Sequence, residues 1–163
     1  MLDRLVKAVG FVVGVFFLAG TPAASQAPLS IRDVMSYSFA SGLVASQTAD
    51  RIAWFENREG ERNIWVAEGP SWEGRQLTDY SGDDGQELAS LVFMPDADRL
   101  LFVRGGAPNR QGEIPDPLFT PDEEGRAIWL VPFAGGVPAQ IMEGGGFALS
   151  PRGDRIAFSR GRG

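Results

Sequence analysis

The sequence predicts an all-β protein built from short strands. The chain of 163 residues contains 21 Gly and 11 Pro, a composition that suits many turns. Long helical periodicity does not follow the N-terminal segment, which argues against a helical fold. A repeat strengthens the prediction, because an Asp-Arg pair followed by apolar residues begins at Asp50, Asp98 and Asp154.

The N-terminal segment, residues 1–27, is typical of a secretory signal peptide. Arg4 and Lys7 precede an apolar run over residues 8–20, and small and polar residues follow it. The apolar run is shorter than the roughly 20 residues that span a bilayer. We therefore expect export to the periplasm or the medium, with no stable membrane span after cleavage.

Composition excludes several classes of partner. The net charge of -6 argues against nucleic acid, whose phosphates are bound by clustered Lys and Arg. The absence of Cys removes disulfides and thiolate metal ligands. We expect no metal and no cofactor.

A second motif recurs between the Asp-Arg repeats with constant spacing. Trp65 precedes Leu77 by 12 residues, and Trp129 precedes Ile141 by the same interval. The other intervals between repeats vary. This pattern is typical of fixed strands joined by loops that absorb insertions.

Each repeat divides into short strands separated by turn residues. The predicted strands of the three units are residues 42–46, 51–56, 62–68 and 75–78; 87–94, 99–104, 126–133 and 138–142; 146–149 and 155–160. The runs at residues 52–55 and 100–103 are apolar without alternation, which predicts burial on both faces.

Four strands in a repeat of this length are typical of a β-propeller blade. We predict a partial β-propeller of about two and a half four-stranded antiparallel blades over residues 42–163. The blades are expected at residues 42–80 and 86–143, with a half blade at 146–160, and a linker is expected at 28–41.

The repeats also carry a family resemblance. Residues 149–158, Leu-Ser-Pro-Arg-Gly-Asp-Arg-Ile-Ala-Phe, resemble the signature of TolB-type, WD40-like propeller repeats. Together with the signal peptide, residues 63–67, 75–78 and 83–88 are similar to the start of exported peptidases of the prolyl oligopeptidase and dipeptidyl peptidase family. The resemblance implies a propeller that gates peptide access to a C-terminal α/β-hydrolase domain.

The residues of a complete catalytic site are missing from this chain. A serine triad needs an imidazole to carry the proton, and the sequence contains no His and no Gly-x-Ser-x-Gly motif. We therefore expect no catalytic residue here, and the leading interpretation is the N-terminal propeller of an exported serine peptidase. The alternatives are a TolB-like periplasmic protein-binding propeller and a truncated product without function.

One acidic loop, residues 79–87, is a candidate contact site. Asp83, Asp84 and Glu87 lie there beside Gly residues, and they could hold a cation or the amino terminus of a substrate through charge-assisted hydrogen bonds. A solvated turn explains the same residues.

A second candidate is the long insertion at residues 105–125, which separates two predicted strands of the second blade. Arg110 and Glu113 lie in it among Pro and Gly. Loops of this length are often functional, and the resemblance suggests contact with a substrate or with the hydrolase domain. A mobile surface loop is the alternative.

Overall fold

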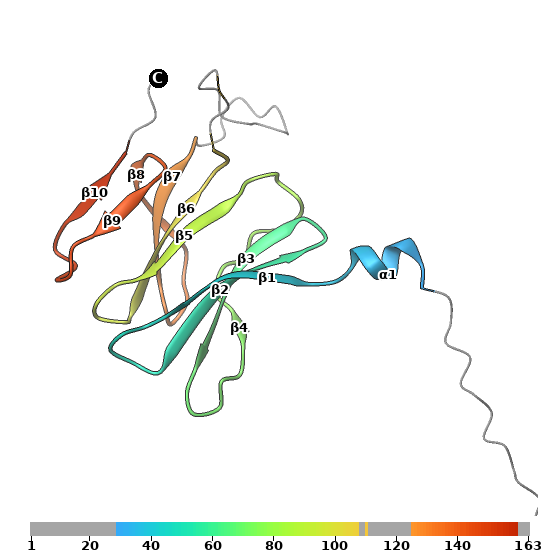
Figure 1. Ribbon diagram of the computed structural model, residues 1–163, viewed down its shortest axis with the longest axis horizontal. Coiled ribbons are helices and arrows are strands. Elements are labelled where there is room, and N and C mark those ends of the chain that lie inside the picture. Colours follow the sequence, from blue (N-terminus) through green and yellow to red (C-terminus); the bar gives the residue numbers. More distant parts are fainter. Residues whose placement is uncertain (1–28, 108–109, 111–124, 160–163) are drawn as a thin grey trace, which may run out of the picture.

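The computed structural model describes residues 29–107, 110 and 125–159 and confirms that the fold is all-β. Three antiparallel sheets lie face to face, and the short helix α1 (Ile31–Met35) lies beyond the end of β1, away from the sheets (Figure 1). The signal peptide predicted over residues 1–27 lies outside the described residues.

Two of the sheets have four strands, and in both the strands follow one another in sequence order. Sheet A contains β1 (Phe39–Ala45), β2 (Arg51–Arg58), β3 (Glu61–Glu68) and β4 (Arg75–Gln76). Sheet B contains β5 (Leu88–Phe93), β6 (Arg99–Arg104), β7 (Ala127–Pro132) and β8 (Ala139–Glu143). Sheet C pairs β9 (Phe147–Leu149) with β10 (Ile156–Phe158).

The predicted four-strand units therefore exist as sheets, and their boundaries differ mainly at the start of the chain. The segment expected as a linker contains α1 and the first residues of β1. Helix α1 begins with a capping box, in which Ser30 and Asp33 each accept a hydrogen bond from the other's backbone N–H. β1 starts early because β2 continues to Arg58, which lets Phe39 pair with Asn57.

Sheets A and B also share an irregularity of the backbone in their first pair of strands. The register of β1 on β2 shifts between Ser41 and Val44, and that of β5 on β6 shifts between Ala89 and Val92. Each shift contains one residue of positive φ, 62° at Gly42 and 54° at Ser90. Sheets A and B thus share a β-bulge at equivalent positions, 48 residues apart.

Two cores hold the three sheets together. The residues buried between sheets A and B are Ala53, Ile64, Val66, Leu77, Leu91, Phe93, Leu100, Phe102, Val131 and Phe133. Leu101, Val103 and Ile128 of sheet B form the second core with partly buried residues of sheet C. Sheet B is therefore covered on both of its faces.

The prediction of burial on both faces is confirmed for one strand and wrong for the other. In β6, residues 100–103 are all at most 1% exposed, because sheets A and C lie on opposite sides of this strand. In β2, Ala53 is buried, whereas Ile52 and Trp54 are only partly buried. No sheet within the described residues covers the face of β2 that carries Trp54.

Candidate functional site

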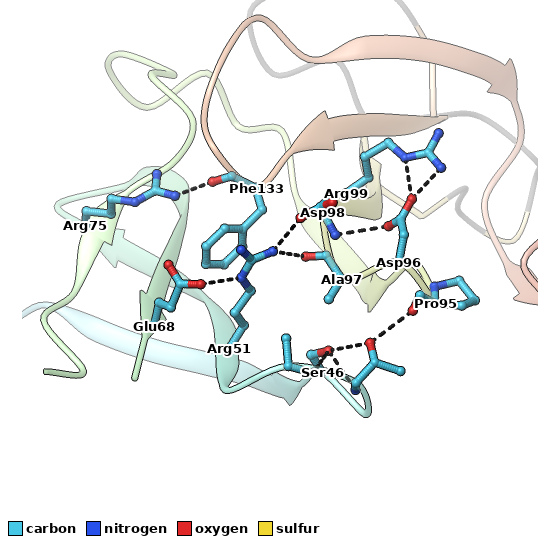
Figure 2. A network of polar contacts seen from close by, with 12 residues as sticks. Ser46, Arg51, Glu68, Arg75, Pro95, Asp96, Ala97, Asp98, Arg99 and Phe133 are labelled. Atoms are coloured by element: carbon cyan, nitrogen blue, oxygen red, sulfur yellow. Dashed lines mark hydrogen bonds and ion pairs between the residues drawn. The ribbon is translucent and has the colours of Figure 1, made fainter. Parts of the chain in front are cut away.

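A network of polar contacts lies where sheets A and B meet, and Arg51 is at its centre (Figure 2). Arg51 begins β2, and its Nε donates to Glu68 Oε1 at 2.8 Å across the strand pair. Its Nη1 donates to Asp98 Oδ1 at 2.7 Å and to the Ala97 carbonyl at 2.9 Å. The guanidinium group therefore joins the start of β2 to the turn between β5 and β6.

An aromatic ring of sheet B completes the site. The Phe133 ring follows β7, and the Arg51 guanidinium carbon lies 4.3 Å from its centroid. Arg75 of β4 lies 5.1 Å from the same centroid and donates to the Phe133 carbonyl (Figure 2). Two cations of sheet A thus hold one aromatic residue of sheet B, a geometry that cation–π attraction favours. We call Arg51, Glu68, Arg75, Asp98 and Phe133 the intersheet clamp.

The electrostatics of the clamp favour a permanent cation. The hydrogen bond to Asp98, followed by that to Glu68, raises the pKa of Arg51 above its ordinary value. Nearby, the Thr48 hydroxyl donates to the Pro95 carbonyl at 3.0 Å and ties the first turn of sheet A to that of sheet B. Chemically, this arrangement fixes sheets A and B to each other.

The acidic loop, residues 79–87, forms a second polar link between the sheets. Asp83 Oδ1 pairs with Arg62 Nη1 of β3 at 3.1 Å, and Asp84 Oδ2 pairs with Arg104 Nη2 of β6 at 2.6 Å. The Arg62 hydrogen bond and then the Gly85 backbone N–H lower the pKa of Asp83. Asp83 and Asp84 are thus each bound to a different arginine.

Among the described residues, Glu87 and Arg110 take no part in these two ion pairs. Glu87 is exposed, and its backbone carbonyl accepts from the Gly105 N–H at 2.9 Å. Arg110 is exposed, and Glu113 lies outside the described residues. Among the residues that the structure describes, no group of three or more acidic side chains is arranged to hold a metal ion.

The sequence reasoning missed the intersheet clamp, although a signal for it was present. Asp98 and Arg51 belong to the recurring Asp-Arg pair, which in the sequence indicates only the repeat. The structure shows that Arg51 of one unit bonds Asp98 of the next. A charged pair that recurs at the start of a strand is therefore a signal for contact between units.

A shallow polar cavity of about 340 Å³ lies beside the clamp. Its lining consists of Ala67, Glu68, Gly69, Ser71, Glu73, Gly74 and Arg75. Since the chain contains no His, Ser71 has no imidazole to accept its proton. The cavity can offer carboxylates and a guanidinium group to a polar ligand.

The sequence matches no protein-family model and no curated protein. Over the described part of the chain, no helix combines the length and the apolar character needed to cross a membrane.

Proposed function

We propose that sheets A, B and C are successive blades of a β-propeller. The supporting observation is that corresponding faces of the sheets play corresponding roles. The back face of sheet A carries Ala53, Ile64 and Val66, and it packs against sheet B. The equivalent back face of sheet B carries Leu101 and Ile128, and it packs against sheet C.

The opposite, front faces of sheets B and C each pack against the preceding sheet. The front face of sheet B carries Leu91, Phe102 and Trp129, which pack toward sheet A. Sheet C uses Ile156, the counterpart of Leu100, against sheet B. Each contact thus joins the front of one sheet to the back of the preceding one, as between blades of a propeller.

We further propose that this propeller is the substrate-selecting part of an exported serine peptidase of the prolyl oligopeptidase family. The signal-peptide pattern and the motifs at residues 63–67, 75–78 and 83–88 support the family. The lack of His requires a proton-carrying imidazole from outside this chain. The paired charges of the clamp suit a rigid support for loops that select peptides.

The experiment is to express the longest reading frame that contains this chain and to treat the product with a fluorophosphonate probe. We expect one labelled serine, placed by mass spectrometry outside residues 1–163, and cleavage of fluorogenic peptides. An unlabelled, inactive product would overturn the peptidase proposal. Capture of an envelope lipoprotein by that inactive product would favour a TolB-like binding protein instead.

A further inference from the structure

The front face of sheet A is built like a covered surface but is open in the described part of the protein. Leu43, Ile52, Trp54 and Trp65 of this face correspond to Leu91, Leu100, Phe102 and Trp129 of sheet B. Leu91 is 5% exposed and Phe102 is fully buried, whereas Leu43 is 68% exposed. Sheet A thus presents the same kind of apolar face that sheet B buries.

The polar clamp shows how a second sheet would be held on such a face. Arg51 at the start of a second strand reaches the Asp98 carboxylate of the neighbouring unit. Asp50 is the counterpart of Asp98 in sheet A, and its side chain is exposed. An arginine at the Arg51 position of a further sheet would therefore meet Asp50.

Whether an arginine at this position reaches outward depends on the residue three places before it. Arg99 is the counterpart of Arg51, but its Nη2 lies 2.5 Å from Asp96 Oδ2, within its own unit. The position of Asp96 is occupied by Thr48 in the first unit, so no carboxylate there competes for Arg51. Arg51 is then available for the neighbouring sheet.

The third unit resembles the first in this respect. Its arginine is Arg155, and the residue three places before it is Arg152, which repels rather than captures a guanidinium group. Arg155 is exposed, and within the described residues its side chain has no hydrogen bond or ion pair. Ala157 of β10 also repeats Ala53, the small residue at the centre of the back face of sheet A.

We propose that two copies of this chain associate head to tail, with sheet C of one copy on the front face of sheet A of the next. Arg155 of the first copy pairs with Asp50 of the second, and Ala157 packs toward Leu43 and Trp54. The contact continues the relation already present between sheets A and B, in which β5 lies beside β1. This inference does not depend on peptidase activity, but it competes with a closed propeller, because further blades of the same chain would cover the front face of sheet A. A wild-type chain that stays monomeric would therefore overturn this inference and leave the proposed function untouched.

The geometry also sets the strength and form of the association. Sheet C has two described strands, so it covers β1 and β2 but not the whole face. Small contacts of this kind are weak, and we expect a dissociation constant of about 10–100 µM. Because the two contacting surfaces differ, the assembly grows as a ladder of oligomers unless the rotation closes a ring.

Sedimentation velocity over a concentration series tests the proposal. For the wild-type chain, the weight-average sedimentation coefficient should rise with concentration. Asp50→Arg and Arg155→Asp should each weaken association about tenfold or more. An equimolar mixture of the two variants should restore association, because contacts between unlike variants pair opposite charges at positions 50 and 155 in both orientations, whereas contacts between like variants juxtapose equal charges.

The controls are Asp79→Arg and Arg32→Asp, which make the same charge changes at exposed positions outside the proposed pair. Both should associate like the wild type. If a charge reversal prevents folding by circular dichroism, Asp50→Asn and Arg155→Gln replace it. A wild-type chain that stays monomeric to about 500 µM, far above the expected dissociation constant, would overturn the proposal. Test variants that behave like the controls, or no recovery on mixing, would also overturn it.

Discussion

Arg51 Nη1 and Asp98 Oδ1 form an ion pair of 2.7 Å between two sheets, although the two residues are 47 positions apart in the sequence. The arginine is largely shielded, with 20% of its side chain exposed, whereas Asp98 is 73% exposed. Most of the stabilisation should therefore come from the several partners of Arg51 together and little from the exposed carboxylate alone.

Replacement of Arg51 tests this distribution. Arg51→Met loses the hydrogen bonds to Glu68, Ala97 and Asp98 and the contact with Phe133, and it should lower the free energy of unfolding by about 1–3 kcal/mol. Asp98→Asn should cost less, about 0.5 kcal/mol. Urea unfolding followed by circular dichroism measures both.

The control for this prediction is Arg99→Met. Arg99 occupies the same repeat position, but among the described residues its side chain bonds only Asp96 of its own unit. Arg99→Met should lower the free energy of unfolding by about 0.5 kcal/mol or less. A loss at Arg99 equal to that at Arg51 would contradict the role assigned to the intersheet clamp.

The shared β-bulge gives a second prediction. An added Cβ at Gly42 would lie 2.7 Å from Phe55 Cδ2 in a backbone of positive φ, so Gly42→Ala should destabilise the chain by about 1–3 kcal/mol. At the equivalent bulge position, Ser90→Gly should change stability by less than about 1 kcal/mol, because relief of strain offsets the gain in chain entropy. Thermal unfolding of the two variants compares them, and a tolerated alanine at position 42 would refute the prediction.

Acid sensitivity should arise in part from Glu56. Burial raises the pKa of this carboxyl, but hydrogen bonds from Ser38, Trp54 and Arg58 outweigh burial and lower it below 4.5. The unfolded chain then binds the proton more tightly, so the stabilisation by Glu56 is full above pH 4.5 and is lost as the pH falls through the lowered pKa.

Glu56→Gln isolates this effect. At pH 7 the variant should be less stable than the wild type by about 1–2 kcal/mol, and the difference should shrink steadily below pH 4.5. Urea midpoints measured between pH 3 and pH 7 check the trend. A difference that stays constant with pH would show that Glu56 does not titrate as described.

The equivalent aromatic residues Trp54 and Phe102 should differ in their contribution to stability. Phe102→Ala removes a fully buried ring between sheets A and B and should cost about 3–5 kcal/mol. Trp54→Ala removes a partly exposed ring from the front face of sheet A, which should cost less than about 2 kcal/mol. Denaturant unfolding at low protein concentration distinguishes them, and equal losses would contradict an open front face.

The sequence predicts the strands of this fold better than their surroundings. The Asp-Arg repeat and the constant spacing after Trp65 were sufficient to predict the four-strand units. Short strands and turns are predictable in this way because neighbouring residues in the sequence determine them. The difference in burial between Ile52 and Leu100 was not predictable in this way. They have similar neighbours in sequence, and only the presence or absence of another sheet decides their burial.

The polar site shows the same limit. Arg51 and Arg99 occur in the same motif, yet the first joins two sheets and the second stays within its unit. The residue opposite on the next strand is Glu68 for Arg51 and Pro132 for Arg99. Such cross-strand partners depend on register, which the repeat pattern alone does not specify.

Residue-level hydroxyl-radical footprinting of Leu43 and Leu91 tests the central claim most directly. The two residues occupy equivalent positions in sheets A and B. Because both are leucine, their intrinsic reactivities with hydroxyl radical are the same, and only their exposures differ, 68% against 5%. At low protein concentration, Leu43 should be oxidised several times faster than Leu91. Equal rates, or faster oxidation of Leu91, would contradict the face-to-face stacking of sheet B on sheet A with the front face of sheet A left open.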